Sequence, residues 1–140
     1  MLVFDTNVVS ELMVPEPHPA FALWFEGQIG TEVATTIVTI AEITFGLARL
    51  PDGARRSRLE SSFAALTGPQ GPLPVLEMGA RDARLCGQLR ARREALGRPI
   101  TFADALIAAI ALGHDGKLAT RNTRDFEGLG IDLIDPWGGF

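Results

Sequence analysis

The stretch MLVFDTNVVSEL, residues 1–12, decides which fold the sequence predicts. Its apolar run at 2–4 predicts a short buried strand, and the pattern from Thr6 to Met13 predicts a helix directly after it. A strand that leads into a helix is the repeating unit of α/β proteins. Asp5 lies at the junction, and α/β sheets bind their ligands outside the carboxyl ends of their strands. We therefore expect Asp5 to be part of a functional site.

The rest of the chain repeats this alternation of strand and helix. A length of 140 residues is that of one domain, which we expect to span 1–140. We expect an α/β fold in which a mainly parallel sheet of four to five strands is covered by helices on both faces. Further strands are predicted at 32–38, 73–78, 117–122 and 131–135, and further helices at 20–28, 39–50, 53–68, 79–97 and 101–114.

The composition argues against secreted and membrane proteins. The apolar run at 105–113 is far shorter than the about 20 residues that a membrane span needs. The N-terminus lacks the basic segment and long apolar segment of a signal peptide. Cys86 is the single cysteine, so no internal disulfide can form. These features favour a reducing, cytoplasmic setting without a membrane.

Charge is distributed unevenly along the chain. The net charge of −4 argues against a protein that coats nucleic acid. The basic residues are nevertheless mostly arginines, which suit bidentate contacts with phosphate. Each of two arginine clusters can be a phosphate-binding surface or a solvated helix face. The first cluster is Arg49, Arg55, Arg56 and Arg58, and the second is Arg81, Arg84, Arg90, Arg92, Arg93 and Arg98.

Four acidic residues are candidates for the functional site, and each also has a structural explanation. Asp5 can cap the helix that follows it. A threonine three residues before an acid fits a capping box, and aspartates are common in turns. The possible boxes pair Thr39 with Glu42 and Thr101 with Asp104, and Asp125 lies in the loop-like segment NTRDF, 122–126.

Glu42 and Asp104 are unusual because their helical segments, 39–48 and 100–113, contain no other charged residue. The residues three and four positions further along are apolar or glycine in both cases, so both acids are predicted to lie on apolar helix faces. An ionised carboxylate buried there costs several kcal/mol unless it is compensated. A helix cap compensates in part, and a metal cation compensates more strongly.

The available ligands indicate which metal such a site would bind. Oxygen ligands alone suit Mg²⁺ or Mn²⁺. His18 and His114 lack the spacing of a zinc site, and His114 is predicted to end the helix at 101–114. Carboxylates that hold Mg²⁺ indicate phosphoryl chemistry, because the ion activates water and stabilises charge on the phosphate. The chain has no P-loop motif, so a P-loop NTPase is excluded.

Four segments together resemble the ordered motifs of PIN-domain ribonucleases. They are VFDTNVVSEL at 3–12, TTIVTIAEITFGL at 35–47, ITFADALIAAIAL at 100–112 and LATRNTRDF at 118–126. The resemblance is to the VapC toxins of type II toxin–antitoxin systems, including the FitB-like branch, and it covers essentially the whole chain.

The resemblance implies a PIN-like three-layer fold with an acidic pocket at the strand ends. It implies a Mg²⁺-dependent endoribonuclease, with Mn²⁺ as a possible substitute, in which Asp5 and Asp104 are the main metal ligands. Glu42 would bind metal directly or orient the attacking water, and Thr6 and Asn7 would support Asp5 by hydrogen bonding.

The fourth acidic position departs from the family pattern. Many members have an aspartate where this chain has Asn122, whose amide oxygen can coordinate a metal but carries no charge. Asp125 would supply the missing carboxylate if the segment is helical there. We expect Asp125 to be the charged member and Asn122 a polar second ligand, which leaves one or two metal ions possible.

The resemblance also implies partners. A cognate antitoxin would lay an extended or helical segment across the toxin and obstruct the acidic pocket, and homodimers or larger toxin–antitoxin assemblies are usual in the family. The helix at 38–50 and an aromatic segment can line such an interface or belong to the core. The residues of that segment are Phe21, Leu23, Trp24 and Phe25.

Two other functions compete with the nuclease. A haloacid-dehalogenase-like phosphatase would use Asp5 as nucleophile, but Asn7 replaces the expected second aspartate and Lys117 is the only lysine. A degenerate PIN module would bind RNA or antitoxin without catalysis, and Asn122 keeps this alternative open. Transfer, ribosomal and messenger RNA are all possible targets. The positions of the arginines do not distinguish them, because RNA recognition depends on shape and splayed bases.

Overall fold

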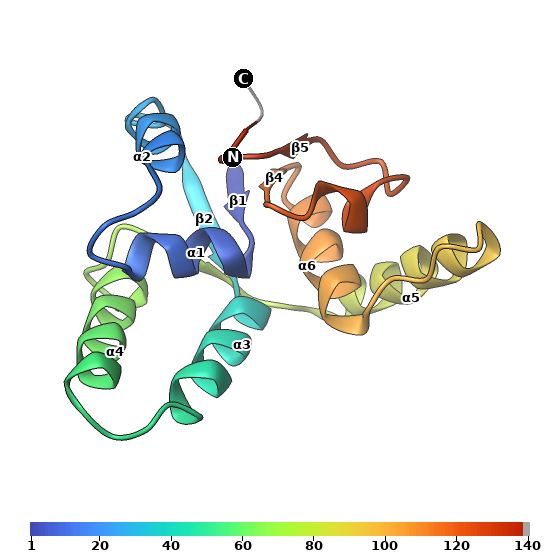
Figure 1. Ribbon diagram of the computed structural model, residues 1–140. Helices are drawn as coiled ribbons and strands as arrows, with labels where there is room; N and C mark the ends of the chain where they lie inside the picture. Colours follow the sequence, from blue (N-terminus) through green and yellow to red (C-terminus); the bar gives the residue numbers. More distant parts are fainter. Residues whose placement is uncertain (139–140) are drawn as a thin grey trace.

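Within residues 1–138, which the computed structural model describes, five strands form one parallel sheet (Figure 1). Residues 139–140, the end of the predicted 1–140 domain, lie outside the described residues. The strand order is β3-β2-β1-β4-β5, so the first strand is central. The bounds are β1 Leu2–Phe4, β2 Val33–Thr36, β3 Val75–Leu76, β4 Lys117–Ala119 and β5 Leu133–Ile134. The predicted α/β fold is confirmed, and all neighbouring strands are parallel.

Helices connect the strands and cover both faces of the sheet (Figure 1). A short 3₁₀ helix, η1, precedes the last strand. The bounds are α1 Thr6–Met13, α2 Pro19–Glu26, α3 Ile37–Ala48, α4 Ala54–Thr67, α5 Ala80–Ala95, α6 Phe102–Gly113 and η1 Thr123–Phe126. None of the helices in the described part of the chain has the length and apolar character that crossing a membrane requires.

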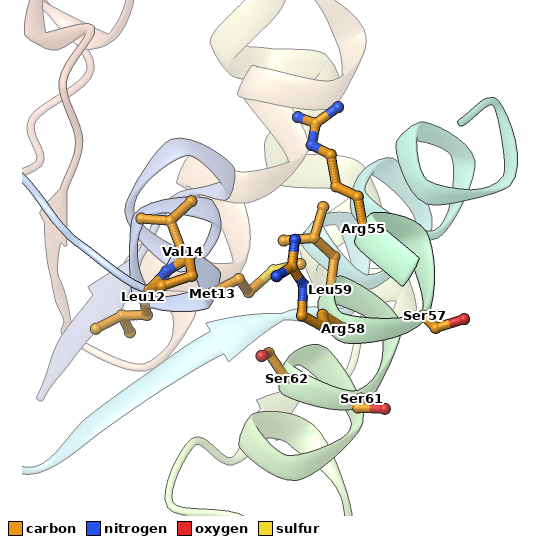
Figure 2. A pocket seen from close by; sticks show the side chains of 10 residues that line it. Leu12, Met13, Val14, Arg55, Ser57, Arg58, Leu59, Ser61 and Ser62 are labelled. Carbon is orange, nitrogen blue, oxygen red and sulfur yellow. The ribbon is translucent and has the colours of Figure 1, made fainter. Parts of the chain in front are cut away.

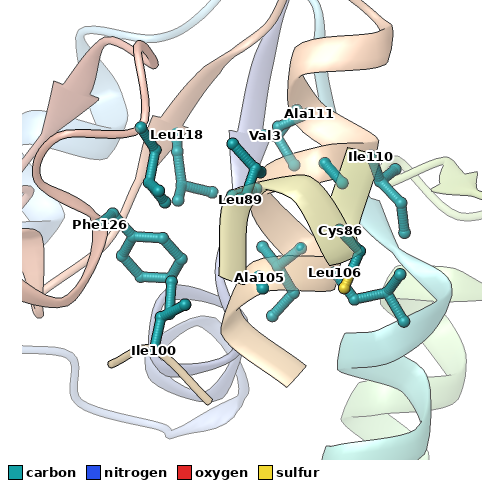
Figure 3. Packing of buried hydrophobic residues seen from close by; sticks show 14 residues of the cluster. Val3, Cys86, Leu89, Ile100, Ala105, Leu106, Ile110, Ala111, Leu118 and Phe126 are labelled. Carbon is teal, nitrogen blue, oxygen red and sulfur yellow. The ribbon is translucent and has the colours of Figure 1, made fainter. Parts of the chain in front are cut away.

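Side chains of β1 alternate between two apolar clusters, as a strand's two-residue period requires. Val3 packs into the cluster that includes α5 and α6 residues, and Figure 3 shows it near Leu89 and Leu118. Leu2 and Phe4 pack into the other cluster, with residues of α1 to α4. Helices, sheet and helices therefore form the three layers that the PIN-like prediction requires.

Several strands end earlier than the sequence predicts. The strand predicted at 32–38 stops at Thr36, because Thr36 caps α3 and its Oγ1 accepts a hydrogen bond from the Thr39 amide at 3.3 Å. The cap sets the start of the helix at Ile37 although Ile and Val favour strands. The strands predicted at 73–78 and 117–122 shorten to two and three residues.

Candidate active site

Asp5 lies directly after β1 and is only 4% exposed. It caps α1, as predicted: its Oδ1 accepts a hydrogen bond from the Thr6 amide at 2.7 Å. Its Oδ2 accepts one from the Thr120 hydroxyl at 2.7 Å and a longer one from Nδ2 of Asn7 at 3.4 Å. Burial raises the pKa of Asp5 above its ordinary value, although the bonds from Thr120 and Thr6 oppose the rise.

Thr120 is a site residue that the sequence analysis missed. It follows β4, and β4 pairs with β1, so the two strands end side by side. The Asp5 amide donates to the carbonyl of Ala119 at 3.0 Å and fixes this register at the last pair. The sequence predicts a strand through residue 122, which places Thr120 inside the strand, so no local signal marked it as a residue at the strand end.

Glu42 does not have the surroundings that the sequence predicts. It is exposed, because α3 buries Thr39, Ile43 and Leu47 and leaves Glu42 beside that stripe. The predicted capping box with Thr39 is also wrong, since Thr36 is the cap. The Oε1 atom of Glu42 instead accepts a 2.6 Å hydrogen bond from the Thr6 hydroxyl.

Asp104 lies in the first turn of α6 and is half-buried. Thr101 caps the helix, as predicted, and its Oγ1 accepts from the Asp104 amide at 3.2 Å. The neighbours Ile107 and Ala108 are fully buried, so the prediction of an apolar helix face is confirmed here. Burial first, and then the negative charge of Asp5, raise the pKa of Asp104 to about 6.

Asp125 approaches the other acids from the 3₁₀ helix η1. The segment is helical there, which was the condition for Asp125 to replace a carboxylate at Asn122. The charge of Asp125 contributes to the raised pKa of both Asp5 and Asp104. Asn122 precedes η1, and its amide donates to the Thr120 hydroxyl at 3.1 Å.

Asn7 connects Asp5 to the segment after β4. Its Nδ2 donates to Asp5, and its Oδ1 accepts from the Arg121 amide at 3.2 Å. Since Thr120 also reaches Asp5, two hydrogen-bonded routes join the start of α1 to residues 120–121. These bonds orient the buried carboxylate and hold the two segments together.

The donor chemistry of this edge fits a hard divalent cation, because the acidic side chains offer only oxygen atoms. Burial and, after it, repulsion by Asp5, Asp125 and Glu42 raise the pKa of Asp104, and a nearby cation would oppose both effects. Within residues 1–138, however, no three His, Cys, Asp or Glu side chains converge closely enough to hold an ion. His18 and His114 are helix caps elsewhere, and His114 ends α6 as predicted.

Arg93 is the buried anchor of η1, not a solvated or phosphate-binding side chain. It is 4% exposed, and its Nε donates to the Arg98 carbonyl at 2.7 Å. One Nη atom donates to the carbonyls of Asp125 and Glu127 at 2.7 and 3.0 Å. Other arginines of the two clusters form ion pairs, Arg56 with Asp52 and Glu60, and Arg98 with Glu127.

A groove of about 650 Å³ lies between the end of α1 and α4 (Figure 2). A smaller cavity of about 290 Å³ shares Met13 and Leu59 with it and is also lined by Thr6 and Glu42. The groove is therefore continuous with a cavity that reaches Glu42. Of the aromatic segment that can line an interface or belong to the core, Phe21 and Trp24 are buried in the core, while Leu23 and Phe25 are 67% and 39% exposed.

The chain is similar to known proteins over its whole length. The PIN domain model matches residues 2–131. The VapC ribonuclease Y4jK of Sinorhizobium fredii is 37% identical over 137 residues, which cover 98% of each chain. Toxin FitB of Neisseria gonorrhoeae is 31% identical over 141 residues, which cover 98% of this chain and 99% of FitB. The solved structure of FitAB bound to IR36 DNA superposes with a TM-score of 0.88 at 30% identity, covering 99% of this chain and 96% of that one.

These matches show that the chain belongs to the PIN domain family. Within the family, its full-length relatives place it among the VapC-type ribonuclease toxins of toxin–antitoxin systems. The resemblance on which the site residues were predicted is therefore confirmed. Membership of the PIN domain family excludes the alternative that the chain is a haloacid-dehalogenase-like phosphatase.

Proposed function

We propose that this chain is a Mg²⁺-dependent endoribonuclease that hydrolyses RNA phosphodiester bonds, and the toxin of a type II toxin–antitoxin pair. One observation carries the proposal: acids from four distant segments lie within electrostatic reach of one another at the carboxyl ends of the strands. They are Asp5, Glu42, Asp104 and Asp125. We also propose that 1–140 form one domain and act in the cytoplasm, where RNA is available.

The proposed roles follow from the position of each side chain. Asp5 and Asp104 would hold the ion, because they are the most buried of the acids and gain most from a compensating charge. Glu42 is exposed and fixed by Thr6, which suits a group that orients water or completes the coordination. Bound Mg²⁺, or Mn²⁺ in its place, supplies a charge that lowers the pKa of water and stabilises the phosphate oxygens.

The surrounding side chains orient these carboxylates. Thr6, Asn7 and Thr120 all donate hydrogen bonds to Asp5, so its oxygens keep one direction. Asp125 supplies the fourth charge from η1, and Asn122 offers an amide oxygen beside it. An uncharged amide in place of a carboxylate weakens a second metal site more than the first.

The experiment is cleavage of labelled total RNA by the purified chain, freed of any partner, with Mg²⁺, Mn²⁺ or EDTA. Asp5→Asn is the matched variant. Discrete fragments should require metal and decrease by at least about 100-fold in the variant. Cleavage that persists in EDTA, or a full rate in a variant with unchanged melting, would contradict the mechanism. Absence of both cleavage and metal binding in calorimetry would favour a module that only binds.

We propose that the groove between α1 and α4 takes a segment of the cognate antitoxin. Support comes from the apolar residues Leu12, Met13 and Leu59 in its lining, its continuity with the cavity at Thr6 and Glu42, and the toxin–antitoxin complexes among its structural relatives. Leu59→Glu should weaken the toxin–antitoxin complex at least about tenfold, because a charge replaces an apolar contact of the groove. Leu23→Glu, on an exposed helix face, is the control.

A homodimer is a further part of the proposal. Its support is that Phe45 and Phe102 are 63% and 59% exposed, so that a second copy of the chain would remove large apolar side chains from water. Sedimentation equilibrium of the partner-free chain should give twice the monomer mass. A monomer at all concentrations tested would contradict it.

A further inference from the structure

Arg121 is held at both ends beside the acidic side chains. Its backbone amide donates to Oδ1 of Asn7 at 3.2 Å, next to the Thr120 hydroxyl that bonds Asp5. Its guanidinium lies over the indole of Trp137, with Cζ 5.1 Å from the ring centroid. A cation at this distance from an indole is attracted to its face. This contact favours one direction of the exposed side chain.

Trp137 is itself fixed by the core. Its ring packs against Phe21 with centroids 5.0 Å apart, and Phe21 is fully buried in the cluster on that face of the sheet. The Trp137 amide donates to Oδ1 of Asp135 at 2.9 Å. Arg121 therefore rests on a ring that is part of the packed structure, which reduces the entropy it loses on binding a ligand.

The charge of Arg121 is not neutralised by an ion pair in the part of the chain that the structure describes, and the same holds for Arg124. Both line a hollow of about 360 Å³ together with Asn122, Thr123 and Asp125. A guanidinium that stacks through its face keeps its N–H groups at the edge, where they can bind two oxygens of one phosphate. The hollow shares Asp125 with the acidic site, so a ligand there lies next to the acids.

The net charge of the chain makes a local cationic site necessary for an anionic substrate. At −4 overall, with acids gathered at the strand ends, the surface repels RNA unless particular arginines attract its phosphates. Arg56, Arg93 and Arg98 are engaged by acids or carbonyl groups of the protein. Arg121 and Arg124 line a hollow that includes Asp125, whereas Arg55 lines the separate cavity at Thr6 and Glu42.

On the basis of the proposed nuclease function, we propose that Arg121, positioned by Trp137 and assisted by Arg124, binds the RNA phosphate adjacent to the one that is cut. Arg121 contacts the phosphate, and Trp137 is a positioning residue that acts through Arg121. The ligand is a phosphodiester of the substrate strand, and not a carboxylate of the antitoxin.

The test is the salt dependence of RNA binding. The probe is a fluorescein-labelled single-stranded RNA of mixed sequence, measured by anisotropy with Mg²⁺ in an Asp104→Asn background that leaves the RNA intact. Arg121→Gln should lower affinity about tenfold and reduce the slope of log K against log salt by about 0.7, the value for one lost phosphate contact on a single strand. Arg84→Gln removes the same charge from the exposed surface of α5 and should leave the slope unchanged.

Trp137 is tested by non-additivity. Trp137→Leu should weaken binding about two- to fivefold through loss of the stacked cation. In the double variant, binding should equal that of Arg121→Gln alone, because Trp137 acts only through the arginine. Trp137→Phe, which keeps a smaller ring, should show an intermediate loss and guards against a folding defect. Additive losses would overturn the positioning role.

Other outcomes would overturn the phosphate contact itself. An Arg121→Gln slope equal to that of Arg84→Gln would do so, and so would an unchanged RNA slope with a weakened antitoxin complex. In cleavage assays with Mg²⁺ and otherwise intact acids, Arg121→Gln should raise KM and leave kcat within about twofold, as expected for uniform binding. RNA that binds with the predicted slope but is not cut by the unaltered chain would contradict the nuclease and still support the phosphate contact.

Discussion

The hydroxyl of Thr120 donates a 2.7 Å hydrogen bond to Oδ2 of Asp5, across 115 positions of sequence. Both residues are buried, and each follows one of two adjacent parallel strands. The bond favours the ionised carboxylate and opposes the rise that burial causes in the pKa of Asp5. The hydroxyl therefore offsets part of the rise in the pKa of Asp5, although burial outweighs it.

Thr120→Val removes the hydroxyl and keeps the shape of the side chain. We expect it to cost about 1.5–3 kcal/mol, the range for hydrogen bonds to charged groups, and to weaken Mg²⁺ binding, because the pKa of Asp5 rises further. Urea unfolding and titration calorimetry measure the two effects. Thr120→Ser keeps the hydroxyl and serves as the control. Unchanged Mg²⁺ affinity in Thr120→Val would show that this bond does not support the metal site.

Asp104 should give the metal-free protein an unusual dependence on pH. Its pKa is raised to about 6 in the fold, so between the unfolded value of about 4 and pH 6 the folded state holds a proton that the unfolded chain has lost. The free energy of unfolding should therefore fall as pH rises through this window. Melting at pH 5 and pH 7.5 measures the change, and Asp104→Asn should show a smaller one.

The same carboxyl should make metal binding depend on pH. Because a proton competes with the cation, the apparent affinity for Mg²⁺ should fall up to about tenfold for each pH unit below the pKa of Asp104, which lies at about 6. Calorimetry with MgCl₂ at pH 5.0 and 7.5 measures this ratio. Equal affinities at the two values would argue that Asp104 does not contact the ion.

The fourth acidic position can be tested by exchanging two neighbours. Asp125→Asn should lower cleavage about 10- to 100-fold, because it removes a charge from the site, and Asn122→Ala should lower it less. Adding Asn122→Asp to Asp125→Asn tests whether a carboxylate at 122 restores the charge. Full activity of Asp125→Asn alone would assign the fourth position to Asn122 or to neither residue.

Arg93 should be among the residues most sensitive to substitution outside the acids. Arg93→Met leaves the carbonyls of Arg98, Asp125 and Glu127 without their donor, which we expect to cost about 2–4 kcal/mol. Urea unfolding measures the loss. Arg56→Met removes ion pairs to the exposed side chains of Asp52 and Glu60 and one hydrogen bond to the Leu50 carbonyl, and it should cost less than Arg93→Met. Equal losses would show that Arg93 does not anchor η1.

The alternation of strands and helices could be predicted because apolar runs and helix caps are local signals. Asp5 and Thr101 illustrate this, since each caps the helix that its position predicts. The strand predicted at 32–38 ended early because a threonine cap prevailed over the β-branched residues after it. Local composition was sufficient to predict which helices and strands form, and it was insufficient to predict the residues at which they end.

The environment of individual side chains was harder to predict, because it depends on tertiary packing. Glu42 lies in an apolar segment and is nevertheless exposed, since a helix buries a stripe and not a whole segment. Arg93 lies in a basic helix and is nevertheless buried, because carbonyls from 32 and 34 positions away surround it. The residues that determine the surroundings of Glu42 and Arg93 in the fold are distant in sequence, so the local sequence does not reveal them. Thr120 was missed for the same reason.

The central place of β1 has a consequence for how the protein is made. The first strand to leave the ribosome needs β2 on one side and β4 on the other, and β4 begins at Lys117. Such distant pairing slows folding and delays it until most of the chain exists. Asp5 therefore remains without Thr120 and Asp125 during nearly all of translation. Under the proposed function, a chain still on the ribosome therefore lacks part of the acidic site that cleavage requires.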